Sequence, residues 1–175
     1  TSVTWALEGA GVLWVGVRQG RRFPRFAGSL LQLLAGVAWL IHVEQHALRD
    51  AAMFANAQFL GGVLIAAAGL FCGAYLHQAR EHVQPYERWL AGLLGSWALL
   101  WWYAGGLWEL AQRAPSEANW GALLLFLAVS IIAFAWLYGW LHWAVLRVVL
   151  LGHVVLLMLT GLAMGLQERQ PFAGM

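Results

Sequence analysis

The sequence lacks lysine altogether and has little charge of either sign. Only 10% of its 175 residues are charged, whereas about a quarter are charged in soluble domains. The hydrophobic share is 62%, which is more apolar surface than a water-soluble fold of this length can bury. These two proportions exclude an ordinary soluble domain and indicate a protein that lies in a lipid bilayer.

Cysteine is also scarce, since Cys72 is the one thiol and no disulfide can form within the chain. The ten basic residues are all arginine, and they lie in short clusters at the ends of apolar runs. This placement indicates a membrane boundary and argues against a nucleic-acid partner. We expect that the first apolar run is not a signal peptide, because no charged n-region or small-residue cleavage site accompanies it. The abrupt start beside helical sequence leads us to expect a single transmembrane region, residues 1–175, cut from a longer protein.

Apolar runs fill nearly the whole chain and are long enough to span a bilayer core of about 30 Å, which needs about 20 helical residues. We therefore predict an all-α, polytopic transmembrane bundle of about six spans, of which the first is short. The predicted spans are Val3–Val17, Phe26–Ala47, Asn56–Leu76, Trp89–Ala111, Trp120–Leu141 and Ala144–Leu166. The four prolines lie between or after these runs, where the loss of a backbone donor is tolerated.

Arginine counts predict the orientation of the spans. The first, third and fifth breaks hold more arginine than the breaks between them. The positive-inside rule then places these three breaks in the cytoplasm and both ends of the chain outside. Because each helical residue rises about 1.5 Å, Glu44 and Glu109 lie about 28 to 31 Å from Arg25 and Arg88, at the outer boundary.

Glu8 is the one carboxylate that this count of residues places inside the bilayer, about 15 Å from Arg18. A carboxylate at that depth costs about 2.5 to 3.5 kcal/mol on insertion scales, so it should face protein or a wet cavity. Thr1, Thr4, Glu8 and Gly11 share one helical face. Glu8 is either a proton or cation site or a hydrogen-bonded structural residue that joins helices.

A charge pattern recurs along the chain. An arginine opens a run that ends in glutamate and is followed by arginine, at Arg25 to Glu44, Arg88 to Glu109 and Arg147 to Glu168. Tandem two-helix hairpins of about 60 residues explain this recurrence, as do ordinary charges at helix ends. If the repeat exists, the first run is the second half of an earlier hairpin.

His42 and His46 are weak candidates for metal ligands, because an i, i+4 spacing places both on one helical face. Glu44 lies on the opposite face and does not join them. The zinc-protease sequence His-Glu-x-x-His is absent, because Val43 follows His42. Two histidines at an outer helix end are the plainer interpretation, and we commit to no metal site. No cofactor is predicted either, because the chain has no haem-attachment, Walker or glycine-rich nucleotide sequence.

Two sets of residues suggest close helix packing. A polar and small stripe runs along the second span, formed by Ser29, Gln32, Gly36, Trp39, His42 and His46. Such a stripe faces another helix or a cavity. Small residues also form ridges at Gly62, Ala66, Gly69 and Gly73 and at Gly161 and Gly165, which allow helix backbones to approach.

The opening sequence Thr4-Trp5-Ala6-Leu7-Glu8-Gly9-Ala10, the later Arg25-Phe26-Ala27-Gly28-Ser29-Leu30 and the segment Phe59-Leu60-Gly61-Gly62 resemble a bacterial family of multi-spanning proteins, domain of unknown function 2339 (DUF2339). The resemblance covers roughly the first half of the chain. It implies a bacterial inner-membrane protein, longer than this chain, and no particular activity.

Two functions remain open from the sequence. The first is an integral inner-membrane protein in transport or an envelope scaffold, whose partners are the lipid bilayer and the rest of its own chain or other membrane helices. The second is a membrane enzyme on lipid-linked substrates at the outer face, built from Glu44, His42, His46 and Glu109 as general acids or bases. The candidate catalytic residues are therefore Glu8, Glu44 and Glu109.

Overall fold

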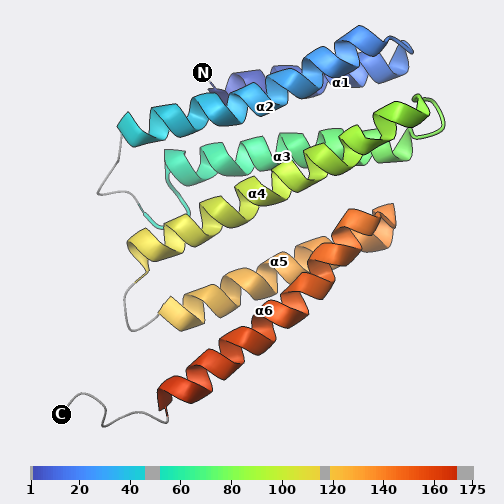
Figure 1. The fold of residues 1–175 in the computed structure, drawn as a ribbon. Helices are drawn as coiled ribbons and strands as arrows, with labels where there is room; N and C mark the ends of the chain where they lie inside the picture. The colour runs from blue at the N-terminus through green and yellow to red at the C-terminus, as the bar shows by residue number, and fades with distance from the viewer. Residues whose placement is uncertain (1, 46–51, 115–118, 169–175) are drawn as a thin grey trace. The chain divides into compact units, whose positions relative to one another are not determined.

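The computed structural model describes residues 2–45, 52–114 and 119–168, and all of the regular structure in these ranges is helical. The helices are α1 (Ser2–Arg18), α2 (Arg22–Gln45), α3 (Ala57–Gln78), the short 3₁₀ helix η1 (Pro85–Glu87), α4 (Arg88–Arg113), α5 (Asn119–Leu141) and α6 (Ala144–Glu168). Figure 1 shows the order of these helices along the chain. The all-α prediction is confirmed.

Five helical segments in the described ranges are long and apolar enough to span a membrane: Arg22–Ile41, Ala57–Gln78, Pro85–Arg113, Trp120–Leu141 and Ala144–Gly165. The chain is therefore a multi-pass membrane protein. The first predicted span, Val3–Val17, is a helix as well, but this helix, α1, has 17 residues, which is about 25 Å at 1.5 Å per residue. Most large side chains on the outside of the helices are apolar, as contact with lipid requires.

The chain divides into two compact units, Thr1–Asn119 and Trp120–Met175. In the first unit α1 packs along α2, α3 packs along α4, and both α1 and α2 contact α3 (Figure 1). The two packed hairpins are thus α1–α2 and α3–α4. The charge pattern instead pairs α2 with α3 and α4 with α5. The observed hairpins therefore begin one helix earlier than the predicted repeat.

Glycine makes the α1–α2 contact close. A methyl group on Gly28 would lie 2.5 Å from the Gly9 carbonyl oxygen and 2.7 Å from the Leu13 nitrogen. A methyl group on Gly16 would lie 2.8 Å from the Arg25 nitrogen. The two backbones therefore pack directly against each other from the turn to the middle of α1, as small residues permit in membranes.

The turn between α1 and α2 is short because Gly20 adopts a positive φ of 66°, which other residues rarely adopt. Pro24 was expected between two runs, but α2 begins at Arg22 and includes it in its first turn. A proline is tolerated there, since the first turn of a helix has no intrahelical partner for its backbone N–H groups.

The second unit contains α5 and α6, joined through His142 at a positive φ of 48°. The ring of Phe134 on α5 lies 6.3 Å from the ring of His153 on α6. His153 is buried, and its Nδ1–H donates to the Val149 carbonyl at 2.9 Å. The predicted ridge of Gly161 and Gly165 is exposed, and methyl groups there would meet nothing within 4 Å, so it packs against no described residue.

Candidate functional site

Glu8 lies on the face of α1 that points away from the first unit's core. The buried residues of α1 are Ala6, Gly9, Ala10, Leu13, Gly16 and Val17. Glu8 is about 140° around the helix from the centre of that set, at 100° per residue, and its side chain is exposed. It borders a shallow apolar hollow with Gly11, Val12, Val15 and Pro24.

The polar stripe predicted around Glu8 shares this outward face. Thr4 and Gly11 are exposed, and a methyl group on Gly11 would meet nothing within 4 Å. Thr1 lies outside the described residues. The described residues of the first unit therefore leave the Glu8 face uncovered, while they bury the opposite face of α1 against α2 and α3.

The outer-face candidates are described only in part. Glu44 and His42 lie in the last turns of α2, where the side chains are outside the described residues, and His46 lies outside them altogether. The proposed assembly of these three residues with Glu109 is not tested. Among the described residues no group of three or more histidine, cysteine or acidic residues could hold a metal ion.

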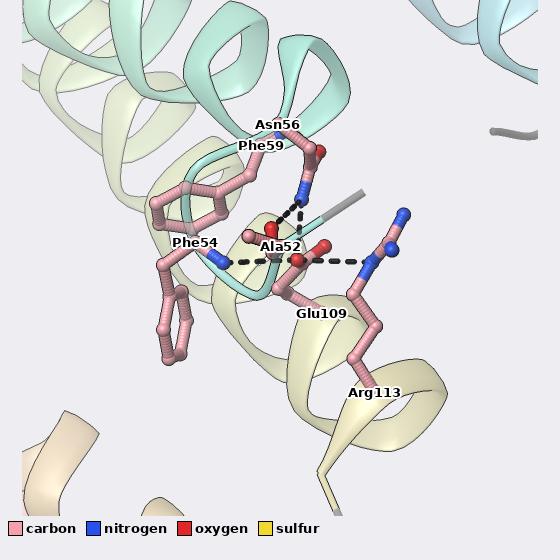
Figure 2. Close-up of polar contacts among 6 residues, drawn as sticks. All are labelled: Ala52, Phe54, Asn56, Phe59, Glu109 and Arg113. Atoms are coloured by element: carbon pink, nitrogen blue, oxygen red, sulfur yellow. Dashed lines mark hydrogen bonds and ion pairs between the residues drawn. The ribbon is translucent and has the colours of Figure 1, made fainter. Parts of the chain in front are cut away.

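Glu109 is buried near the end of α4 and bonds the start of α3 (Figure 2). Its Oε1 accepts from the Asn56 amide at 2.5 Å and from the Phe54 backbone N–H at 3.1 Å, and it lies 3.1 Å from the Arg113 Nε. The ion pair with Arg113 is an i, i+4 pair at the end of α4. Three donors on one oxygen explain the burial of this carboxylate without a catalytic role.

Asn56 connects this cluster to α3 by capping the helix. Its side-chain oxygen accepts from the Phe59 backbone N–H at 2.8 Å, and its amide also donates to the Ala52 carbonyl at 3.2 Å. The sequence placed Asn56 inside a span, whereas the structure makes it the N-cap residue, which asparagine favours. We call Asn56, Glu109 and Arg113 the outer cluster.

A second buried cluster joins α2 to the segment before α4. Arg25 Nη2 lies 2.9 Å from Glu87 Oε2 and donates to Oε1 at 3.1 Å, and the two side chains are 3% and 0% exposed. Glu87 Oε2 also accepts from the Gln84 backbone N–H at 3.2 Å. Arg25 is therefore an internal residue that holds two hairpins together, in addition to marking the end of a span.

Glu87 is the site residue that sequence reasoning missed. It lies 62 residues from Arg25, and nothing in the local pattern pairs them. One signal was present: Gln84-Pro85-Tyr86-Glu87 places an acid three residues after a helix-start position, where its side chain can bond the backbone. That signal explains the turn but gives no hint of the partner on α2.

The polar stripe of α2 faces α3 and α4. Gln32 is fully buried, and its amide donates to the Ile65 carbonyl of α3 at 2.9 Å. A methyl group on Gly69 would lie 3.3 Å from the Gln32 nitrogen, so the predicted glycine ridge of α3 makes room for this side chain. The stripe is therefore a helix-packing surface inside the first unit.

Tryptophan rings surround the next turn of the same stripe. Gly36 lies against Trp97 and Trp101 of α4, and the Trp101 ring packs at 5.2 Å from Trp39 and 5.8 Å from Trp97. The Gln32 Oε1 and the indole nitrogens of Trp97 and Trp101 are buried and have no hydrogen-bond partner among the described residues. An acceptor and two donors thus lie among these three helices at about the middle of their length.

Comparison of the chain with protein-family models, with curated proteins and with solved structures gives no match.

Proposed function

We propose that this chain is part of a bacterial inner-membrane protein that works as a helical scaffold, and that the Glu8 face of α1 contacts other membrane helices. The resemblance of its first half to domain of unknown function 2339 supports the bacterial inner membrane. The arginine distribution supports cytoplasmic placement of the turn before α2 and of the segment between α3 and α4.

One observation carries the scaffold function: Glu8 is exposed near the middle of α1, on the face that the described residues of the first unit leave open. We place α1 in the membrane, where this position lies at about mid-bilayer depth. A carboxylate facing lipid at that depth is costly, and a neighbouring helix that donates a hydrogen bond removes the cost. Gly11 on the same face lets a second helix approach closely. The contacting helix belongs to the same protein or to another one.

Photo-cross-linking in intact membranes tests this function. A photoreactive amino acid replaces Glu8, or in the control replaces Ile132, which is 70% exposed in the middle of α5. The expected result is a protein adduct at position 8, found as a mass shift in a gel and identified by peptide sequencing, and mainly lipid adducts at position 132. Lipid adducts alone at position 8 would show that no helix covers this face.

Transport is a second candidate, and the interior of the first unit favours it. Gln32 and the indole nitrogens of Trp97 and Trp101 place polar atoms without partners among packed helices. Buried groups of this kind lie along many substrate and proton pathways. In proteoliposomes loaded with a pH-sensitive dye, the wild type should then pass protons faster than Gln32→Leu, and equal rates in both and in empty liposomes would remove this candidate.

A further inference from the structure

Two turns of the first unit that are far apart in sequence lie side by side. The turn between α1 and α2 holds Gln19 to Arg21, and the segment between α3 and α4 holds residues 79–87. The buried Arg25–Glu87 ion pair connects them. A second contact does so as well, because the guanidinium of Arg22 stacks over the ring of Tyr86 at 5.7 Å. The two turns therefore form one continuous surface at one end of the unit.

That surface carries a strong positive charge. Its exposed arginines are Arg18, Arg21, Arg22, Arg80 and Arg88. Glu81 is the exposed acid among the described residues of the two turns, so five positive charges against one negative leave a net charge of +4. The buried pair Arg25 and Glu87 adds nothing, since its charges cancel. We call these five residues the arginine surface.

Exposed aromatic rings border the same surface. Phe23 is 84% exposed, Tyr86 51% and Trp89 58%. Aromatic rings of this kind lie at the level of the lipid headgroups, between the hydrocarbon and the water. The ring of Trp14 also holds the guanidinium of Arg18, at 5.0 Å. The arginine surface therefore lies at headgroup depth, where phosphate groups are its nearest anions.

We propose that the arginine surface binds the headgroups of anionic phospholipids. Guanidinium groups bind phosphate oxygens in pairs of parallel hydrogen bonds, which ammonium groups cannot do. Clusters of four to eight basic residues beside a membrane helix attract anionic lipid, by a free energy that corresponds to about fivefold in affinity for each charge. Arginines from four helix ends, joined by the Arg25–Glu87 pair, present this charge over a single area.

The opposite end of the unit gives the contrast. Its described arginine, Arg113, is paired with Glu109 inside the outer cluster and is half-buried. Anionic lipid should therefore favour one end of the first unit over the other. This inference is independent of whether α1 contacts other helices.

Native mass spectrometry of the purified full chain tests the inference. The protein in detergent is mixed with equal amounts of phosphatidylglycerol and phosphatidylcholine of the same acyl composition, and the bound lipids are counted. We expect phosphatidylglycerol adducts to exceed phosphatidylcholine adducts several-fold in the wild type. Arg18→Gln, Arg21→Gln, Arg22→Gln, Arg80→Gln and Arg88→Gln combined should remove this preference, and each single change should remove part of it.

The control Arg147→Gln removes an exposed arginine outside the surface and should leave the preference unchanged. Equal binding of both lipids by the wild type overturns the inference, as does an undiminished preference in the fivefold variant. Binding of inorganic phosphate by a wild type that shows no preference for phosphatidylglycerol would identify a site for soluble phosphate and also overturn it. If the variant with all five changes fails to fold, the comparison of the two lipids on the wild type still tests the inference.

Discussion

Arg25 of α2 and Glu87 of η1 form an ion pair at 2.9 Å whose two side chains are 3% and 0% exposed. The pair joins the α1–α2 hairpin to the α3–α4 hairpin at the end where both turns lie. The pair stabilises the first unit only while both members are present, because one buried charge without its partner is not compensated.

Glu87→Ala should therefore destabilise the first unit severely. Removing one member of a buried ion pair costs about 3 to 5 kcal/mol. Thermal unfolding of the purified protein in detergent, followed by circular dichroism, measures the effect. Glu81→Ala is the control, since Glu81 is an exposed acid in the same segment and its loss should change the unfolding temperature little.

The double change Arg25→Leu with Glu87→Leu sharpens this prediction. Replacing a whole buried ion pair by apolar residues is often neutral or stabilising. We therefore expect the double variant to unfold at a higher temperature than Glu87→Ala. A double variant less stable than the single one would show that the pair contributes more than its desolvation costs.

Gly28→Ala should weaken the contact between α1 and α2. The added methyl group would lie 2.5 Å from the Gly9 carbonyl oxygen and 2.7 Å from the Leu13 nitrogen, and neither backbone atom can move alone. Overpacking of this kind costs about 1 to 3 kcal/mol. Gly92→Ala on α4 is the control, because a methyl group there meets nothing within 4 Å. Equal unfolding temperatures of the two variants would contradict the close approach.

Asn56→Ala should loosen the outer cluster. The change removes the N-cap of α3, which is worth about 1 kcal/mol, and takes one donor from the buried Glu109. Gln112→Ala, at an exposed position near the end of α4, serves as the control and should be neutral. Hydrogen exchange of the first turn of α3 should become faster in the Asn56 variant alone, and unchanged protection would mean that Asn56 does not cap the helix.

The orientation can be checked with a maleimide that does not cross membranes. Gln19→Cys and Gln84→Cys place exposed thiols on the two turns of the arginine surface, and Gln112→Cys places one near the opposite end of α4. The positive-inside rule predicts that intact spheroplasts label position 112 but not positions 19 and 84, which react only after lysis. Cys72 is buried and should not react with the maleimide in any variant. Labelling of positions 19 and 84 but not 112 in intact spheroplasts would show that the orientation is the opposite of the predicted one.

The helices could be predicted closely because hydropathy and proline positions are local signals. The predicted spans start and end within four residues of the observed helices, and the largest difference comes from the first turn of α2, where Pro24 is accommodated. Glu8 was singled out by counting residues from Arg18. Its direction could not be predicted, because the buried face of α1, formed by Ala6, Ala10, Leu13 and Val17, is set by contacts with α2 and α3.

The tertiary partners could not be predicted in the same way. Arg25 looked like one more boundary arginine, because its sequence neighbours Arg21 and Arg22 are of that kind and its partner Glu87 lies 62 residues away. The stripe through Gln32 and Gly36 was recognised, but the sequence could not decide between a cavity and a helix. The side chain of Gln32 reaches the Ile65 carbonyl only because α3 has Gly69 at the facing position, which is a relation between two helices.

The sequence separation of Arg25 and Glu87 has a consequence for biogenesis. The two residues are 62 positions apart, so the α1–α2 hairpin is synthesised before the acid that pairs with Arg25. A lone buried charge is costly, so Arg25 becomes buried only when the second hairpin docks and brings Glu87 to it.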